Sequence, residues 1–251
     1  MLKITALSVL QGVAEFLPIS SSGHLVLGER LLGLQELGMR LDIFLHLGTL
    51  LSVGVFYFAI LKRIIAQREW SYAAKIVLSA IPAGVVGMCF KDQLEALFDS
   101  PTAVGYALCF TGLILIGTKF LPKAEAPVSF FKAFLISVAQ AIAILPGVSR
   151  SGMTIAAAKA SGVKAEKAAE FSFLMSIPPI AGAALLEVVK SLKSASATPE
   201  VSWSMAIYGS LIAAVVGYFS LKLLLSSLKS DRFWYFGIYC IFAGGLTVCL
   251  S

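Results

Sequence analysis

Long apolar runs alternate with short polar loops along the whole chain. Six of these runs are long enough to cross the hydrocarbon layer of a bilayer, which is about 30 Å thick. They cover residues 43–61, 72–90, 102–118, 171–186, 203–221 and 233–250. The pattern therefore predicts six transmembrane helices.

Two further apolar runs, residues 4–32 and 133–160, are each interrupted near the middle. Pro18 and Pro146 stand at the interruptions, and a Ser- and Gly-rich cluster follows each one. Proline removes a backbone donor and disfavours helix in the residue before it, so each run is expected to form two half-helices. Broken backbone is tolerated at membrane depth only where protein or a wet cavity surrounds it. We predict two re-entrant helical hairpins; the alternative is four kinked, full spans.

The two interrupted runs resemble each other, and the likeness extends beyond them. Four pairs match at an offset of 129 residues: Gln11 and Gln140, Ser20 and Ser149, Ser22 and Ser151, and Gly23 and Gly152. The chain therefore divides into two repeats, 1–122 and 130–251, joined by a polar linker at 123–129, within one integrated membrane domain. Each repeat holds one hairpin and three crossings, and an odd number of crossings inverts the second repeat relative to the first.

Composition and charge support a polytopic, all-α membrane protein. The chain is 58% hydrophobic and 14% charged, with a mean hydropathy of +0.89, so a soluble fold could not bury its apolar surface. One set of alternate loops carries 13 Lys/Arg against 5 Asp/Glu and the other set carries 6 against 8, which places the first set in the cytoplasm. The net charge of +6 is scattered over short loops, which argues against nucleic acid as a partner.

The first hairpin places two oxygen-bearing side chains on one helix face, Gln11 and Glu15. Residues four apart are neighbours on a helix, and oxygen ligands suit a hard cation such as Mg²⁺ or Ca²⁺. A charge near the middle of a membrane costs about 2.5 to 3.5 kcal/mol on insertion scales. Glu15 therefore needs either a function or a partner, and the alternative to a metal role is a pair with Arg150 that holds the repeats together.

Hydroxyl groups follow at the start of the second half-helix. Ser20, Ser21 and Ser22 precede His24, and a helix N-terminus of this kind binds anions through its free N–H groups and its dipole. An imidazole beside hydroxyls can carry a proton during phosphoryl transfer. His46, at the head of the first span, is interpreted as structural, with an indirect contact to the site as the alternative.

The second hairpin repeats the arrangement with a cation added. Ser149, Arg150 and Ser151 follow Pro146, and Thr154 lies one helical turn further on. A guanidinium binds phosphate oxygens in a bidentate fork. Together the two hairpins predict a phosphate site inside the membrane.

These residues resemble a known family. The segments QGVAEFLPISSSGH (11–24) and PGVSRSGMT (146–154), with EFSFLMSIP (170–178) downstream, are similar to the bacterial undecaprenyl-diphosphate phosphatase, or bacitracin-resistance, family. The resemblance covers essentially the whole chain. It implies hydrolysis of undecaprenyl diphosphate to the monophosphate and inorganic phosphate, which recycles the lipid carrier for cell-wall synthesis. It also implies a divalent cation, the bacterial inner membrane, and a site open to the periplasmic or outer face.

The resemblance also assigns roles to single residues. The acidic motif falls on Gln11 and Glu15, the catalytic serine on Ser21 and the histidine on His24, and the phosphate-binding motif on Ser149, Arg150, Ser151 and Thr154. Ser20 and Ser22 complete the expected phosphate contacts. Gln11 stands where many members carry Glu, which leaves a single carboxylate for the metal.

The expected mechanism is attack by Ser21 on the terminal phosphorus, with His24 or Glu15 accepting the proton and Arg150 stabilising the charge. Attack by water or by His24 remains open. The competing class is an inverted-repeat transporter or flippase for polyprenyl phosphate, since this architecture is common among carriers. The expected partners are a polyprenyl diphosphate lipid and the bilayer, with a homodimer as an option that the sequence leaves open.

Overall fold

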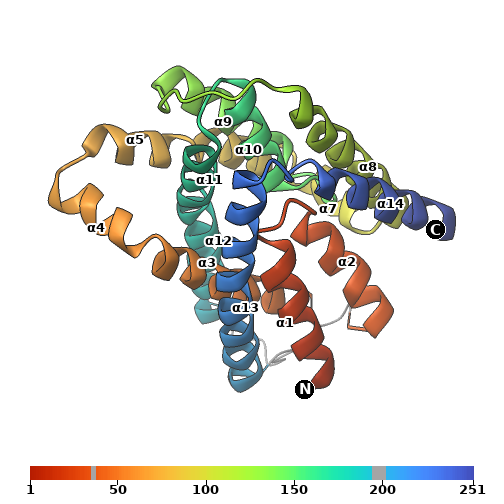
Figure 1. Ribbon diagram of the computed structural model, residues 1–251. Coiled ribbons are helices and arrows are strands. Elements are labelled where there is room, and N and C mark those ends of the chain that lie inside the picture. Colours follow the sequence, from red (N-terminus) through yellow and green to blue (C-terminus); the bar gives the residue numbers. More distant parts are fainter. Residues whose placement is uncertain (35–37, 194–201) are drawn as a thin grey trace.

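Helices make up most of the computed structural model, which describes residues 1–34, 38–193 and 202–251 (Figure 1). The helices are α1 (Leu2–Ala14), α2 (Ser21–Leu32), α3 (Gly38–Phe56), α4 (Phe58–Ala66), α5 (Trp70–Leu78), α6 (Ile81–Cys89), α7 (Lys91–Phe98), α8 (Pro101–Gly117), a 3-10 turn (Thr118–Phe120), α9 (Phe130–Ile142), α10 (Arg150–Ala160), α11 (Ala165–Leu174), α12 (Ile177–Lys193), α13 (Trp203–Lys229) and α14 (Tyr235–Leu250). No named strand occurs in the described ranges, where only an isolated bridge joins Ala126 to Val163. The predicted all-α class is confirmed.

Among the described residues, four helical stretches are long and apolar enough to cross a membrane, and α3 with α4, bent by 65°, makes a fifth if it counts as one span. The four are Trp70–Cys89, Pro101–Phe120, Ala165–Leu186 and Trp203–Lys229. The sixth predicted span corresponds to α14, which has 16 residues and rises only about 24 Å. The molecule is therefore a multi-pass membrane protein, with four or five candidate spans in the part of the chain that the structure describes.

Both interrupted runs form two helices separated by a turn, as predicted. In the first run α1 ends at Ala14 and α2 begins at Ser21, and in the second α9 ends at Ile142 and α10 begins at Arg150. Each second helix is capped by a serine: the Ser20 hydroxyl accepts from the Gly23 N–H at 3.3 Å, and the Ser149 hydroxyl from the Gly152 N–H at 3.1 Å. These caps satisfy backbone donors that would otherwise be unpaired.

The long helix α13 packs against α1 and α3, while α8 runs along α14 (Figure 1). Glycines at the α8–α14 contact let the two backbones approach closely. A Cβ on Gly105 would lie 2.9 Å from the Gly244 carbonyl oxygen, and a Cβ on Gly112 would lie 2.7 Å from that of Gly237. Small residues at such contacts are how membrane helices associate without a hydrophobic driving force.

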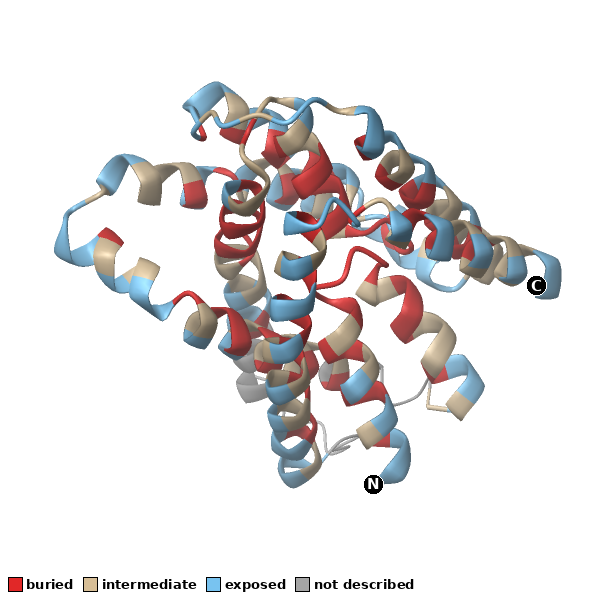
Figure 2. Cartoon of the chain, in the orientation of Figure 1, coloured by how far each residue is buried: buried red, intermediate tan, exposed pale blue. Residues whose placement is uncertain are grey.

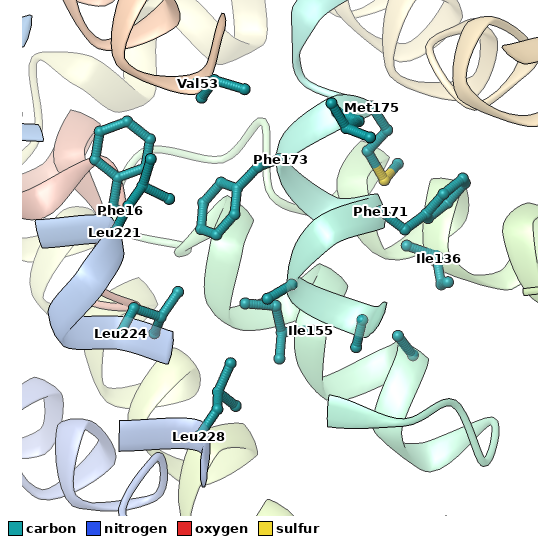
Figure 3. Packing of buried hydrophobic residues seen from close by; sticks show 14 of the residues in the cluster. Phe16, Val53, Ile136, Ile155, Phe171, Phe173, Met175, Leu221, Leu224 and Leu228 are labelled. Carbon is teal, nitrogen blue, oxygen red and sulfur yellow. The ribbon is translucent and has the colours of Figure 1, made fainter. Parts of the chain in front are cut away.

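Buried residues gather at the centre, where the turns of both interrupted runs meet α11 (Figure 2). The largest apolar cluster there includes Phe16, Phe173 and Leu221, with Phe16 and Phe173 in edge-to-face contact at 5.4 Å between ring centroids (Figure 3). Phe16 directly follows Glu15 in the chain. The core therefore fixes the backbone on which the polar residues stand.

The neighbouring glycines of α14 give a matched test of the α8 contact. A Cβ at Gly244 would lie 2.5 Å from the Gly105 oxygen, whereas one at Gly245 meets nothing within 4 Å. Gly244→Ala should lower the free energy of unfolding by about 1–3 kcal/mol through overpacking, and Gly245→Ala should leave it unchanged or raise it. Thermal unfolding in detergent measures both, and equal melting temperatures would contradict this packing.

Candidate active site

The turn between α1 and α2 brings a carboxylate against a hydroxyl. The Ser21 Oγ donates to Glu15 Oε2 at 2.7 Å, and the Gln11 Nε2 donates to the same oxygen at 3.2 Å. Gln11 is fully buried and Glu15 is 7% exposed. Ser20, which caps α2, has a φ of +70°, an uncommon conformation for a residue with a side chain. This turn directs Ser21, the first residue of α2, back toward Glu15.

The turn between α9 and α10 is held by α8. The Thr111 hydroxyl donates to the Gly147 carbonyl at 3.1 Å and accepts from the Ser149 N–H at 3.0 Å. Gly147 has a φ of +94°, and a Cβ there would collide with the Val104 carbonyl oxygen. Only glycine fits this position, because both the conformation and the space exclude a side chain.

The two turns touch. A Cβ on Gly23 would lie 2.9 Å from the Cα of Gly147, and the Ser151 hydroxyl donates to the Leu17 carbonyl at 3.4 Å. Segments about 130 residues apart in the chain thus form one polar centre.

An ion pair joins the two turns across this contact. The Arg150 Nη2 donates to Glu15 Oε1 at 2.5 Å, and Nη1 donates to the Ser172 carbonyl at 3.1 Å. The guanidinium also lies over the Phe173 ring, 5.8 Å from its centroid. The Arg150 side chain is 18% exposed, so part of it remains accessible to a ligand.

A cavity of about 860 Å³ opens beside this pair. Its polar wall includes Glu15, Ser21, Ser22, His46 and Arg150, and its apolar wall includes Leu25, Val26, Ile144, Val148, Pro179 and Ile180. A wide, mostly apolar cavity with a few convergent polar groups is typical of a site for an amphipathic small molecule.

The remaining predicted phosphate ligands lie behind this wall. Thr154 is fully buried, and its hydroxyl donates to the Arg150 carbonyl at 2.8 Å and shares a 2.6 Å hydrogen bond with Ser172. Ser149 and Ser151 are 1% and 2% exposed and lie 3.3 Å apart at their hydroxyls. Ser20 is 2% exposed. In this arrangement these hydroxyls shape the turns, and their direct contact with phosphate stays a prediction.

The sequence favoured His24 as the histidine of the site, whereas the structure places His46 at the cavity wall. His24 has both ring nitrogens engaged: Nδ1 with the Ser20 carbonyl at 2.8 Å and Nε2 with the Tyr239 hydroxyl at 2.7 Å. It is not among the residues that line the cavity, and its catalytic role stays a prediction. His46 lines the cavity, with Nε2 3.5 Å from Glu15 Oε2.

Sequence reasoning underestimated His46. Its Nδ1 donates to the Asp42 carbonyl at 2.7 Å, which leaves Nε2 as the nitrogen that can exchange a proton with Glu15. The one available indication was the polar pair Asp42 and His46, four residues apart at the start of an apolar run. Ser172, Tyr239 and Thr111 carried no such indication, because a single Ser, Tyr or Thr in a membrane helix does not by itself indicate what it contacts.

The expected cation at Gln11 and Glu15 finds few free ligand atoms. Glu15 Oε1 is paired with Arg150, and Oε2 already accepts from Ser21 and Gln11. Gln11 Oε1 is buried without a partner, and one amide oxygen does not make a hard-cation site. The part of the chain that the structure describes contains no group of three His, Cys, Asp or Glu side chains placed to hold a metal. The residues as arranged therefore do not fit a cation at this position.

Membrane-length helices and a buried Ser–Glu–Arg set beside an amphipathic cavity define an integral membrane protein with a site suited to an anionic lipid. The family described as bacitracin resistance protein BacA matches residues 4–246. The chain belongs to this family.

Named relatives agree with that assignment. An undecaprenyl-diphosphatase from Halothermothrix orenii is 37% identical over 255 residues, 99% of this chain and 97% of the relative. One from Bacteroides thetaiotaomicron is 40% identical over 253 residues, 97% of this chain and 96% of the relative. One from Desulforapulum autotrophicum is 38% identical over 266 residues, 96% and 95% of the two chains.

The ion pair between Glu15 and Arg150 predicts how single and double variants should change the free energy of unfolding. Arg150→Met leaves the buried Glu15 charge without its partner, and we expect a loss of about 3–5 kcal/mol in the free energy of unfolding. The double variant Glu15→Gln/Arg150→Met should recover most of that loss, because no charge is left buried. Thermal unfolding in detergent measures the cycle.

The surface pair of Lys123 with Asp231, 2.6 Å apart with side chains 87% and 58% exposed, serves as the control. Lys123→Met should leave the melting temperature unchanged, since exposed ion pairs are screened by solvent. A double variant as unstable as Arg150→Met alone would show that Glu15 and Arg150 do not depend on each other.

Proposed function

We propose that this protein hydrolyses undecaprenyl diphosphate to undecaprenyl phosphate and inorganic phosphate in the bacterial cytoplasmic membrane. The activity would recycle the lipid carrier of cell-wall synthesis and confer resistance to bacitracin. The observation that carries the proposal is the contact of the Ser21 hydroxyl with Glu15 Oε2 while Arg150 holds the other oxygen of the same carboxylate. Family membership and the named relatives support the same substrate.

The proposal includes a topology. The pairs α1–α2 and α9–α10 would be re-entrant hairpins that enter from opposite faces, within inverted repeats of residues 1–122 and 130–251. The support is that α1, with 13 residues, and α10, with 11, are short for a crossing, and that their turns meet. Loop charges support a cavity mouth on the periplasmic or outer side, because Glu29, Asp42 and Asp99 of the outer loops line the cavity. A homodimer is compatible with this topology.

In this proposal the diphosphate enters the polar end of the cavity and the isoprenoid lies along the apolar wall. The Arg150 guanidinium would bind the terminal phosphate, as a planar fork suits phosphate oxygens. Ser22 lines the same end and would add a hydroxyl donor. The tail would follow Val26, Ile144 and Ile180 toward the lipid.

The proposed chemistry has two steps. Ser21 Oγ forms a bond to the terminal phosphorus as the bond to the bridging oxygen breaks, and Glu15 takes the hydroxyl proton because Ser21 already donates to it. His46 Nε2 can exchange that proton with Glu15 and pass it toward the leaving phosphate. Water then hydrolyses the phosphoserine, releasing inorganic phosphate. His24 remains the alternative acceptor, on the condition that it leaves Tyr239. We also propose that Mg²⁺ or Ca²⁺ supports activity.

The first test is phosphate release from undecaprenyl diphosphate by the purified protein in detergent. Arg150→Ala should lower kcat/KM by at least about 100-fold, since it removes the main positive charge facing the transferred group. Lys159→Ala, which changes a cationic residue in the last turn of α10, is the control and should retain activity. Equal turnover by wild type and Arg150→Ala would refute the site, and lipid translocation without phosphate release would favour a carrier.

The second test identifies the nucleophile. Brief reaction with substrate labelled in the terminal phosphate, followed by acid quench, should trap label on Ser21, and Ser21→Ala should abolish trapping and lower kcat by about 10³-fold or more. A parallel alkaline quench preserves phosphohistidine, which acid destroys, so label on His24 would also be detected. Label on His24, or undiminished turnover by Ser21→Ala, would overturn the assignment of Ser21.

A further inference from the structure

His24 and Tyr239 form a hydrogen-bonded pair beside the turn that carries Ser21. Tyr239 lies on α14, 215 residues further along the chain, and its hydroxyl is 2.7 Å from His24 Nε2. The two rings are nearly parallel, with centroids 5.7 Å apart and planes at 17°. His24 is 9% exposed and is not among the residues that line the cavity. The pair therefore adjoins the site without facing the space that the substrate would fill.

The other ring nitrogen fixes where His24 carries its proton. Nδ1 lies 2.8 Å from the Ser20 carbonyl oxygen, and a carbonyl oxygen only accepts hydrogen bonds, so Nδ1 bears the proton. In the neutral ring Nε2 is then the acceptor, and the Tyr239 hydroxyl donates to it. Both nitrogens are engaged away from Ser21, so His24 in this arrangement does not take the Ser21 proton.

The Ser20 carbonyl is the group that this pair holds. Ser20 has a φ of +70°, which is costly for a residue with a side chain and persists only where neighbouring groups hold it. The peptide bond that contains this carbonyl is planar and leads directly into Ser21, whose Oγ donates to Glu15 Oε2 at 2.7 Å. A change in the direction of the Ser20 carbonyl therefore also turns Ser21.

Helix α14 supports the same turn at a second point. The Cys240 Sγ lies 3.5 Å from the Pro18 carbonyl oxygen, and Cys240 is fully buried. α14 packs on α8, where Thr111 bonds to Gly147 and Ser149 in the turn that carries Arg150. The α8–α14 pair is thus a common support for both turns.

We propose that Tyr239 and His24 are positioning residues for Ser21. Tyr239 fixes the ring of His24, His24 fixes the Ser20 carbonyl, and the turn aims the Ser21 hydroxyl at Glu15, which accepts the proton. A misplacement of about 1 Å at a reacting group can cost about 100-fold in rate, so the pair affects kcat more than KM. The effect on kcat rests on the proposed function, whereas the hydrogen bonds of His24 do not.

The first arm of the test measures phosphate release from undecaprenyl diphosphate by the full-length protein in detergent. His24→Ala should lower kcat by about 100-fold with KM changed by less than about threefold. In His24→Asn the side-chain N–H can replace Nδ1 as the donor to the Ser20 carbonyl. This variant should regain at least about tenfold of the lost kcat and keep the wild-type pH profile, because the residue does not titrate in the reaction.

Tyr239 has a matched control in the same helix. Tyr239→Phe should lower kcat by about tenfold, and Tyr235→Phe, the same change one turn earlier on α14, should have the wild-type kcat. Three results would overturn the proposal: His24→Asn as impaired as His24→Ala, a pH profile that loses a limb in His24→Asn, or a wild-type kcat in Tyr239→Phe. Gel filtration and thermal unfolding verify that each variant is folded.

The second arm reads the hydrogen bonds without substrate, by nuclear magnetic resonance of protein labelled with ¹⁵N-histidine. The chain has two histidines, so His46→Gln identifies the signals of His24. We expect the Nδ1–H tautomer for His24, and a shifted Nε2 signal in Tyr239→Phe but not in Tyr235→Phe. An Nε2–H tautomer, or an Nε2 signal that Tyr239→Phe leaves unchanged, would contradict the pair. The expected tautomer in a wild-type protein that releases no phosphate would refute the proposed hydrolysis while supporting the hydrogen-bonded pair.

Discussion

The ion pair between Glu15 and Arg150 is the interaction on which the polar centre depends. Each charge alone would be costly in an apolar interior, and each comes from one of the two turns that touch. The ion pair stabilises both turns, and it holds the α1–α2 segment against the α9–α10 segment. The Phe16–Phe173 contact, which is one residue from Glu15 and one from Ser172, holds the pair in place from the apolar side.

Two turns of similar sequence bring these groups together. Ser21 and Arg150 are the first residues of α2 and α10, each preceded by a capping serine. Equivalent turns that pack through Gly23 and Gly147 place these two side chains at one centre. A hydroxyl from one turn and a guanidinium from the other therefore contact the same carboxylate, Glu15.

The sequence predicted the half-helices, because proline and glycine act locally, and it gave the pair of Glu15 with Arg150 as the alternative to a metal role, because a buried charge admits few solutions. It did not predict which histidine faces the cavity. That outcome depends on the rotation of α2 after the positive φ at Ser20 and on Tyr239, 215 residues away from His24. Nor did the sequence predict that Thr154, one turn from Arg150, contacts Ser172 in α11 and is not among the residues that line the cavity.

Both oxygens of the Glu15 carboxylate already accept hydrogen bonds, and these bonds affect how well Glu15 can act as a base. Glu15 accepts hydrogen bonds from Arg150, Ser21 and Gln11. The protein alone therefore orients this carboxylate. Binding of a phosphate at Arg150 would withdraw positive charge from Glu15 and make the carboxylate a stronger base toward Ser21. The same pair that stabilises the fold would then activate the serine only when an anion is present. Without a bound anion, the Glu15 carboxylate would stay paired with Arg150, and the Ser21 hydroxyl would be less nucleophilic than in the presence of the anion.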